Sequence, residues 1–331
     1  MISEQLLIDA RVAAIDAGER VRGTTSPNPP VGCAIVDAEV GIIATAGTHP
    51  AGGPHAEAAA LALAGERARG ATAVATLEPC NHTGRTGPCA EALVRAGVAE
   101  VVYLTADPNP IAAGGAEYLR EHGVSVRHHS VPVRALAPWL VAVQQGRPAV
   151  TWKYAATADG FTAAADGTSQ WITGEEAREW VHEDRATRDA IIVGTGTAIA
   201  DNPSLTARRP DGSLFPTQPR RVVIGSRPVP GGKLAELGFE QYPDPPTALR
   251  ELWSSGARDV LVEGGAGLAR SFLEADLVDF VQAYIAPAFL GAGRGVLGGE
   301  VAGTIANAHR FSPVRAQLMG EDVLFEMRRK A

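Results

Sequence analysis

The sequence has 331 residues, of which 45% are hydrophobic and 20% charged, so it is long enough for two globular domains with separate cores. Its formal net charge of −7 and the lack of a long basic run exclude broad nucleic-acid binding through a positive face, although local arginines can still bind a phosphate. No stretch approaches the roughly 18 uninterrupted apolar residues of a transmembrane helix.

The chain has three cysteines, Cys33, Cys80 and Cys89, a small odd number that argues against a disulfide framework. Residues 1–11 lack a basic region followed by a long apolar run, so we expect no signal peptide. We therefore expect a reducing cytoplasm, where cysteines serve as metal ligands more often than as bridged pairs.

The first half of the chain alternates helix-like and strand-like segments. Strands are predicted over residues 31–36, 41–46, 71–77, 101–104 and 124–126, and helices over residues 3–22, 56–64, 90–96 and a segment that ends near His122. This alternation predicts a central sheet covered by helices.

Gln145-Gly146-Arg147-Pro148 predicts a short linker, which divides the chain into domains of residues 1–146 and 147–331. In the second half, strands are predicted over residues 149–156, 190–193, 221–224, 260–262, 277–285 and 321–327, with a helix over residues 175–185 and a loop over residues 228–232. The second domain is therefore also expected to be α/β.

The strongest pattern in the sequence is His55-Ala56-Glu57, followed by Pro79-Cys80 and then by Cys89. A catalytic zinc ion takes three imidazole, thiolate or carboxylate ligands and keeps an open position for water, which loses a proton more easily on the metal. An acid two residues beyond the histidine can move protons without binding the metal. His55, Cys80 and Cys89 are the predicted zinc ligands and Glu57 the predicted catalytic proton carrier, as in zinc deaminases.

Each part of this pattern has an ordinary alternative, because a lone buried cysteine is usually a core residue and His-Ala-Glu occurs by chance. The combination favours zinc, since His55 follows a Gly-Gly-Pro turn and opens a predicted helix, and Cys89 opens the next one. Cys33, inside a predicted strand, is interpreted as core filler. A non-catalytic zinc scaffold is the alternative of another class, but such a site needs no acid like Glu57.

Eight residues separate Cys80 from Cys89, whereas nucleic-acid and nucleoside deaminases commonly have Cys-x-x-Cys. The segment Cys-Asn-His-Thr-Gly-Arg-Thr-Gly-Pro-Cys resembles the deaminase domain of the bifunctional riboflavin biosynthesis proteins. So do the segments Pro27-Asn28-Pro29-Pro30-Val31-Gly32, Gly53-Pro54-His55-Ala56-Glu57, Leu77-Glu78-Pro79-Cys80 and Asp107-Pro108-Asn109-Pro110. The resemblance implies that Asn28 and His82 line the deaminase pocket; the alternatives are a turn residue and a loop-stabilising donor.

The resemblance continues past the linker and spans nearly the whole chain. It is carried by Lys153-Tyr154-Ala155-Ala156-Thr157-Ala158-Asp159-Gly160, Ser169-Gln170-Trp171-Ile172-Thr173, Asp189-Ala190-Ile191-Ile192-Val193-Gly194, Asp201-Asn202-Pro203-Ser204-Leu205-Thr206 and Glu263-Gly264-Gly265. It implies a cytidine-deaminase-like α/β/α domain followed by an α/β reductase domain that is similar to dihydrofolate reductase.

Gly264-Gly265-Ala266-Gly267 lies between a predicted strand and an apparent helix. Glycines there let the backbone approach a pyrophosphate, whose charge a helix N-terminus favours; the alternative is an ordinary tight turn. Gly194-Thr195-Gly196 does not complete the dinucleotide fingerprint, because Ile199 takes the place of the third glycine.

By the same resemblance, the second domain uses NADPH. The implied NADPH contacts are Ala155, Trp171, Thr197, Asp201, Ser226, Gly265, Ala266, Gly267, Leu268, Ala269, Arg270 and Ser271. The implied substrate contacts are Ser169, Arg185, Leu205, Arg208 and Glu263. Both arginines suit a sugar phosphate, with solvated surface arginines as the alternative; Glu263 could instead merely end a strand.

The chain departs from the family near the expected adenosine end of the cofactor. Gly225 stands where an acidic residue is common, and the region of residues 225–252 is short. Ser226 and Arg227 are candidates there for a 2′-phosphate.

The resemblance implies two steps of riboflavin biosynthesis: hydrolytic deamination of a phosphoribosylamino-pyrimidine, then NADPH-dependent reduction of its ribosyl group to ribityl phosphate. The expected partners are these small molecules, with neither nucleic acid nor membrane. We also expect a homodimer or higher homo-oligomer, with residues 277–285 as the contact surface or, alternatively, as a core strand. A deaminase of free cytidine or of tRNA adenosine with an unrelated C-terminal domain, and a chain with only one active half, stay open.

Overall fold

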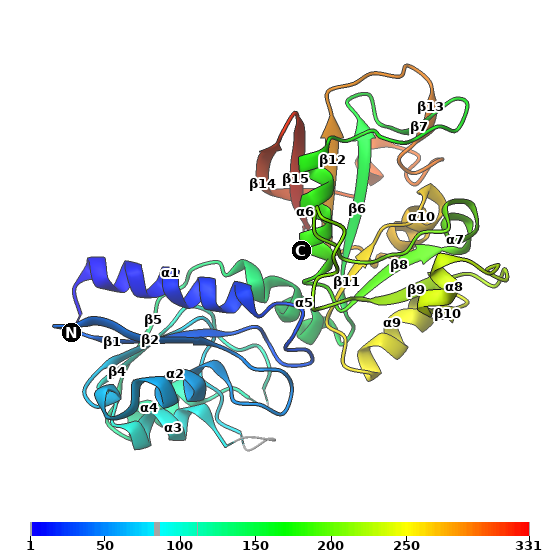
Figure 1. Cartoon of the computed structure of the whole chain (residues 1–331). Coiled ribbons are helices and arrows are strands. Elements are labelled where there is room, and N and C mark those ends of the chain that lie inside the picture. Colours follow the sequence, from blue (N-terminus) through cyan, green and yellow to red (C-terminus); the bar gives the residue numbers. More distant parts are fainter. Residues whose placement is uncertain (1, 83–86, 111, 331) are drawn as a thin grey trace. The chain divides into compact units, whose positions relative to one another are not determined.

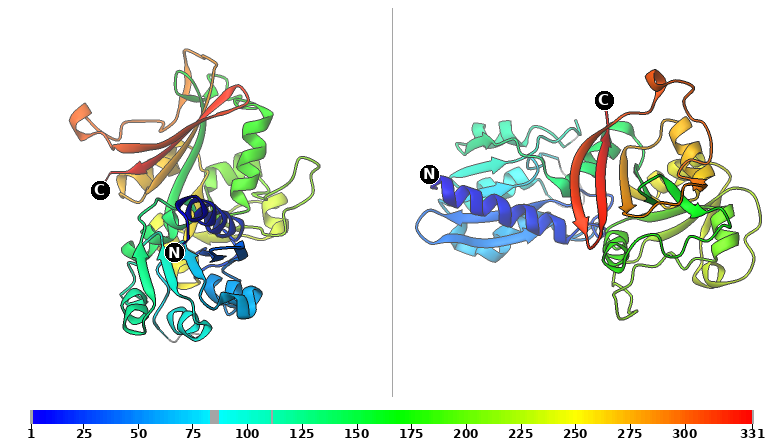
Figure 2. Two further views of the ribbon diagram at one scale, coloured as in Figure 1. Left: turned by 90° about the vertical axis from the view of Figure 1, so that its left-hand side faces the viewer. Right: turned by 90° about the horizontal axis from the view of Figure 1, so that it is seen from above.

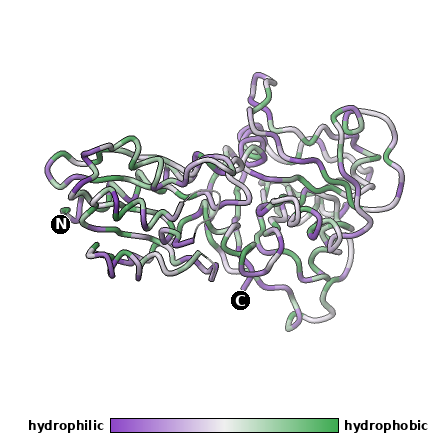
Figure 3. The backbone as a smooth tube through the Cα atoms, turned by 90° about the horizontal axis from the view of Figure 1, so that it is seen from below, coloured by the Kyte–Doolittle hydropathy of each residue, from purple (hydrophilic) through white to green (hydrophobic). Residues whose placement is uncertain are grey.

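The structure, a computed structural model, describes residues 2–82, 87–110 and 112–330. The chain forms two compact units, Met1–Gly146 and Arg147–Ala331 (Figure 1). Hydrophobic and hydrophilic stretches alternate along both (Figure 3). None of the helices in the described ranges combines the length and the apolarity needed to cross a bilayer.

The first unit is built on a five-stranded sheet with the order β2-β1-β3-β4-β5. Its strands are β1 (Gly32–Asp37), β2 (Gly41–Gly47), β3 (Thr72–Ala75), β4 (Glu100–Tyr103) and β5 (Ser125–His128). Strand β1 is antiparallel to both of its neighbours, whereas β3, β4 and β5 are parallel. The parallel strands bring their carboxyl ends to one edge, where the loops that carry both cysteine ligands begin.

Helices cover both faces of this sheet, because apolar residues alternate between the faces along each strand. Helix α1 (Glu4–Arg20) packs on one face, while α2 (Ala56–Ala64), α3 (Cys89–Ala96) and α4 (Gly115–Glu121) pack on the other (Figure 1). Two short 3-10 helices, η1 (Gly65–Ala68) and η2 (Arg134–Leu136), and α5 (Ala137–Gln145) complete the unit. The α/β/α arrangement predicted from the sequence is confirmed.

Local sequence signals explain where these helices begin. Ser3 caps α1, since its Oγ accepts a hydrogen bond from the Leu6 N–H at 3.2 Å. Gly32 lets β1 approach α1 closely, because a Cβ there would lie 1.8 Å from the Ala14 carbonyl oxygen. The predicted helix over residues 56–64 is α2 with the same bounds.

The second unit is built on an eight-stranded sheet with the order β10-β9-β8-β11-β6-β12-β15-β14. Its strands are β6 (Ala149–Thr157), β8 (Ala190–Gly194), β9 (Arg220–Ile224), β10 (Glu240–Tyr242), β11 (Asp259–Val262), β12 (Phe280–Ala286), β14 (Phe311–Met319) and β15 (Asp322–Arg329). All adjacent pairs from β10 to β12 are parallel, and β15 and β14 close the sheet as an antiparallel hairpin (red in Figure 2). A small second sheet pairs β7 (Phe161–Ala164) with β13 (Gly293–Gly295).

Helices again cover both faces of the large sheet. The side chains of α9 (Pro245–Ser254) and α10 (Ala266–Glu274) share one core cluster with β8, β9 and β11. On the opposite face lie α6 (Glu175–Arg185), α7 (Thr195–Asp201) and α8 (Lys233–Leu237), and η3 (Ile305–Asn307) precedes the final hairpin. The second α/β domain is thereby confirmed.

One sequence-based expectation about surfaces is wrong. Residues 277–285 were the expected contact surface of an oligomer, but strand β12 lies inside the sheet, hydrogen-bonded to both β6 and β15. The side chains of Val281, Ala283 and Tyr284 are at most 2% exposed. The apolar character of this segment therefore reflects a core strand, which was the alternative interpretation.

Candidate active sites

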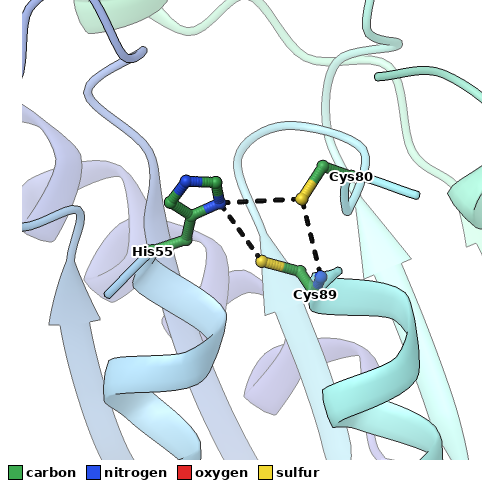
Figure 4. Close-up of side chains that lie close together, drawn as sticks. All are labelled: His55, Cys80 and Cys89. Carbon is green, nitrogen blue, oxygen red and sulfur yellow. Dashed lines mark hydrogen bonds between the residues drawn. The ribbon is translucent and has the colours of Figure 1, made fainter. Parts of the chain in front are cut away.

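Three predicted ligands converge at the edge of the first sheet (Figure 4). His55 is the N-cap residue of α2 and makes no side-chain capping bond, so its ring is free to turn toward the two cysteines. Cys80 follows β3 by a short loop, and Cys89 is the first residue of α3. The strand order thus brings together residues that lie 34 positions apart in the chain.

The separations of these ligand atoms fit a tetrahedral zinc ion. The His55 Nδ1 lies 3.6 Å from the Cys80 Sγ and 3.4 Å from the Cys89 Sγ. Zinc bonds of about 2.3 Å to sulfur and 2.0–2.1 Å to nitrogen at tetrahedral angles place such atoms about 3.5 Å apart. Among the described residues, these three form the one group of His, Cys, Asp and Glu side chains close enough to hold a metal ion.

The surroundings of Cys80 favour its thiolate form. The Cys89 side chain and the His55 ring lower the pKa of Cys80 to about 4, and the Cys89 N–H donates a hydrogen bond to its sulfur at 3.5 Å. The positive ends of α2 and α3 both lie at the site, which also favours negative charge. A thiolate is the form in which cysteine binds zinc.

Glu57 lies in the first turn of α2, beside the cysteines, and is 4% exposed. Burial, followed by the charge of Cys80, raises the pKa of this carboxyl group to about 7. A buried carboxyl group next to a ligand group can accept and return a proton near neutral pH. Cys33, by contrast, is fully buried in the main core of the unit, which confirms it as core filler.

Tight backbone packing holds the Cys80 loop in place. Gly115 opens α4 directly against this loop, and a Cβ at Gly115 would lie 1.7 Å from the Pro79 carbonyl oxygen. The Asn81 N–H donates to the Ala112 carbonyl oxygen at 3.0 Å. Any side chain at Gly115 would therefore displace the loop that carries a metal ligand.

The two predicted deaminase substrate residues belong to loops of the same unit. Asn28 lies in a turn in which its N–H donates to the Thr25 carbonyl oxygen at 2.9 Å. His82 follows the Cys80 loop, and its Nδ1 is buried without a hydrogen-bond partner among the described residues. Residues 83–86 of the motif lie outside the described residues.

In the second unit, the carboxyl ends of β8 and β9 and the glycine turn after β11 border a cavity of about 600 Å³. Of the predicted NADPH contacts, Thr197, Gly265, Ala266, Gly267, Leu268, Arg270 and Ser271 line it. Gly265 is the N-cap of α10, and its N–H donates to the Thr197 Oγ1 at 3.2 Å. The cavity thus combines a helix N-terminus with glycine-rich backbone, the arrangement that suits a pyrophosphate.

The other predicted NADPH contacts lie elsewhere. Ala269 points into the core of the unit and is 1% exposed, because it lies on the inner face of α10. Ala155, Asp201 and Ser226 do not line the cavity. Trp171 lies at a second cavity of about 750 Å³, with the Arg178 guanidinium 4.6 Å from its ring centre.

Only three of the predicted substrate residues of the reductase, Arg185, Arg208 and Glu263, lie close together. Arg185 and Glu263 make two hydrogen bonds of 2.7 Å to each other, and Arg208 lies next to the same α6 surface. Leu205 has its side chain in a core cluster and is 3% exposed. Ser169 is exposed in the segment between β7 and α6.

Several residues of these sites were not predicted. Lys153, known only as a member of a motif, has its Nζ 3.9 Å from the Glu263 carboxylate and 5.5 Å from the Tyr284 ring centre. Arg294, which no pattern singled out, lines the cavity of about 600 Å³ together with Arg227, the candidate for a 2′-phosphate. No sequence pattern joins these residues, because only the folded sheet brings their segments together.

Two family models match the chain. The RibD C-terminal domain matches residues 148–325, and the zinc-binding region of cytidine and deoxycytidylate deaminases matches residues 9–105. The second range contains the three metal ligands and Glu57, and the first contains the whole cavity of about 600 Å³.

The similarity to known proteins extends over the full chain. The riboflavin biosynthesis protein RibD of Corynebacterium ammoniagenes is 55% identical over 315 residues, which cover 93% of this chain and 94% of that protein. The RibD of Escherichia coli is 38% identical and covers 95% and 97%. A solved deaminase/reductase structure from Thermotoga maritima, 32% identical, covers 98% and 99% with a TM-score of 0.87.

Proposed function

Since the chain belongs to the RibD family of bifunctional deaminase–reductases, we propose that residues 1–146 carry out the deamination and residues 147–331 the reduction. Within riboflavin biosynthesis the chain catalyses the deaminase and reductase steps of RibD. The match of the RibD C-terminal domain removes the alternative of a nucleoside deaminase with an unrelated second domain.

The deaminase reaction takes place at the zinc site of His55, Cys80 and Cys89. The metal supplies an acidified water as the nucleophile. Glu57 would accept one proton of that water on its carboxylate and pass it to the pyrimidine ring nitrogen as the C–O bond forms. It would then take the proton of the newly added hydroxyl group and pass it to the amino group, which leaves as ammonia when the C–N bond breaks. Asn28 and His82 bind the pyrimidine, and this role is supported by the His82 Nδ1, which has no hydrogen-bond partner within the described ranges.

The reductase reaction uses NADPH, whose nicotinamide supplies the hydride for the ribosyl carbon. The α10 N-terminus and its glycines bind the pyrophosphate in the cavity of about 600 Å³. Glu263 directly follows β11, next to the glycine turn of this cavity. Lys153 lies within β6 and forms an ion pair with Glu263. We assign them, with Ser169 and Leu205, to the sugar end of the substrate.

Arg208 is the residue that we assign to the substrate phosphate. It is exposed, whereas the side chain of Arg185 is 15% exposed and already paired with Glu263. A guanidinium without a carboxylate partner is the better ligand for a new anion. Arg185 then acts by keeping Glu263 ionised and oriented.

The proposed NADPH contacts agree only in part with those expected from the sequence. Besides the seven predicted NADPH contacts that line the cavity, Arg227, the candidate for a 2′-phosphate, and Arg294 supply positive charge there. Arg227 follows β9 and donates from its Nε to the Thr195 Oγ1 at 3.4 Å. We assign Arg227, together with Ser226, to the 2′-phosphate that distinguishes NADPH from NADH, and keep Ala155, Trp171, Asp201 and Ala269 as further proposed contacts.

We also propose that the chain forms a homodimer or higher homo-oligomer through the β14–β15 hairpin. Leu318 is paired with Val323, and Ala316 with Phe325, so these four side chains share one face. Leu318 is 72% exposed and Phe325 40% exposed. A cytoplasmic location is proposed from the thiolate ligands, which require a reducing compartment.

The observation that carries the proposal is the zinc geometry in one unit and the glycine-lined cavity in the other, each within its family match. The test is to incubate the purified chain with the deaminase substrate, without and with NADPH, and to resolve the products. Without NADPH the deaminated ribosyl compound should accumulate, and with NADPH the ribityl compound should replace it. Accumulation of the ribosyl compound in both cases would mean that only the deaminase domain is active.

A further inference from the structure

His182, in the last turn of α6, lies between the two arginines of the proposed substrate site. Its Nε2 is 3.3 Å from the Arg208 Nη2, and its Nδ1 is 3.4 Å from the Arg185 Nη1. The Nδ1 also lies 3.1 Å from the Thr206 carbonyl oxygen, to which the Arg185 Nη1 donates at the same distance. One imidazole ring thus links α6 to the loop that carries Arg208.

These neighbours favour one tautomer of the ring, because the Arg185 Nη1 donates to the Thr206 carbonyl oxygen at 3.1 Å, which is shorter than its 3.4 Å contact with Nδ1. A guanidinium only donates, so the Nε2 that faces Arg208 must be an acceptor. The proton of a neutral ring then sits on Nδ1 and donates to the Thr206 carbonyl oxygen, which explains the 3.1 Å contact. Burial, followed by the charges of Arg185 and Arg208, lowers the pKa of His182 to about 4, in agreement with a neutral ring.

The carbonyl oxygen that orients the ring is itself held in place. Leu205, directly before it, has a φ of 48° and its side chain in the core. The Ala207 N–H donates to the Gln218 Oε1 at 3.0 Å, and the Gln218 Nε2 donates back to the Ala207 carbonyl oxygen at 2.8 Å. Thr206 therefore lies between two anchored residues.

Arg208 is exposed and yet held at two nitrogens. Its Nη1 donates to the Ser204 Oγ at 3.2 Å, and its Nη2 faces the His182 Nε2. Nothing in the described part of the chain gives Arg208 a carboxylate within ion-pair distance, so its charge is free for a ligand. An arginine that is oriented before binding loses less conformational freedom when an anion arrives.

We propose that His182 is a positioning residue of the reductase: as a neutral acceptor, it aims Arg208 at the phosphate of the substrate. This inference rests on the proposed function, in which Arg208 is the phosphate ligand. His182 itself touches neither substrate nor cofactor in this role, and its effect passes entirely through Arg208.

The sharpest test compares His182→Asn with His182→Gln in the full chain. Asparagine keeps a donor near the position of Nδ1 but cannot reach Arg208, whereas the glutamine Oε1 reaches the position of Nε2. With 5-amino-6-(5-phosphoribosylamino)uracil and saturating NADPH, His182→Asn should raise KM roughly two- to tenfold with little change in kcat. His182→Gln should stay near the wild-type KM, and NADPH affinity, measured by fluorescence titration, should be unchanged in both.

A double-mutant cycle with Arg208→Ala separates this inference from the function on which it rests. If His182 acts through Arg208, His182→Asn should have no further effect on KM once Arg208 is gone. The positioning role would be overturned if the two substitutions raised KM independently, so that the double variant showed the product of the two single effects. Equal KM values for the Asn and Gln variants would also overturn it. Either result would leave Arg208 as phosphate ligand. An unchanged KM in Arg208→Ala would instead remove Arg208 from the phosphate and the inference with it.

Discussion

Arg185 and Glu263 face each other in a two-fold hydrogen bond, with the Nε–Oε1 and Nη2–Oε2 distances both 2.7 Å. Burial alone would raise the pKa of Glu263, but the charge and hydrogen bonds of Arg185 lower it to about 2. The pair therefore holds an ionised carboxylate at the end of β11, beside the glycine turn of the cofactor cavity. It also leaves Arg208, not Arg185, with the charge available to a phosphate.

The first prediction concerns this phosphate. Arg208→Ala should raise the KM for the phosphorylated reductase substrate about tenfold to more than a hundredfold, since a charged hydrogen bond is worth about 1.5–3 kcal/mol. Steady-state kinetics with purified intermediate measures it. NADPH affinity and ammonia release should be spared. Arg209→Ala is the matched control, because Arg209 is bound to its own loop through Ser213 and the Leu214 carbonyl oxygen; equal effects of both variants would refute the assignment.

The second prediction concerns the stability of the reductase unit. Glu263→Gln leaves the buried Arg185 charge without its partner and should cost about 3–5 kcal/mol in the free energy of unfolding. Glu240→Gln, which removes a half-exposed ion pair with Arg220, should cost less than about 1 kcal/mol. Urea unfolding of both full-length variants compares them. Similar losses would mean that the Arg185–Glu263 pair contributes no more than a surface pair.

The third prediction gives the pH dependence of this stability. The pKa of Glu263 is lowered in the folded chain to about 2, so its contribution is present above the unfolded value of about 4.5 and is lost as pH falls from there toward 2. The pKa of His182 is also lowered in the folded chain, to about 4. Between about pH 6.5 and pH 4 the imidazole therefore takes up a proton only in the unfolded chain, so the stability of the fold decreases as pH falls through this interval. In His182→Gln the Tm difference from wild type should shrink over that second interval. A constant difference from pH 7 to pH 4 would contradict the assignment of a neutral ring.

The fourth prediction concerns the metal. Elemental analysis should find about one zinc ion per chain, and Cys89→Ser should lose most of it together with deaminase activity. Cys33→Ala should keep the zinc, since Cys33 lies in the core and outside the ligand group. Reduction of supplied intermediate should survive in both variants. Active deaminase without bound metal would refute the zinc site.

Much of this picture follows from sequence patterns because the relevant signals are local. The helices α2 and α6 have the bounds that their sequences predict. The metal ligands were found because His55 and Cys89 each stand at the start of a helix and Cys80 follows a strand and a proline. Strand β14 was not predicted, because it contains Pro313 and a register shift next to it, and one of its faces is exposed apolar surface.

Most of the predicted residues that line the cavity of about 600 Å³ are consecutive in the sequence. They belong to the turn and first helical turns of α10, whereas Arg294 comes from β13 and was not predicted. Similarly, the role proposed for His182 depends on a loop that α6 meets only after folding. Such relationships depend on which strands become neighbours in the sheet, and no local periodic pattern in the sequence indicates this order.

The central claim is that two separate sites, one in each unit, act in sequence. Glu57→Gln tests it directly when NADPH oxidation is measured twice, once with the deaminase substrate and once with the deaminated intermediate. The variant should retain its zinc, with Glu66→Gln as an exposed control on the same segment. We expect no NADPH oxidation from the first compound and a wild-type rate from the second. Wild-type oxidation from the deaminase substrate, or loss of oxidation with both compounds, would contradict two sites that act independently.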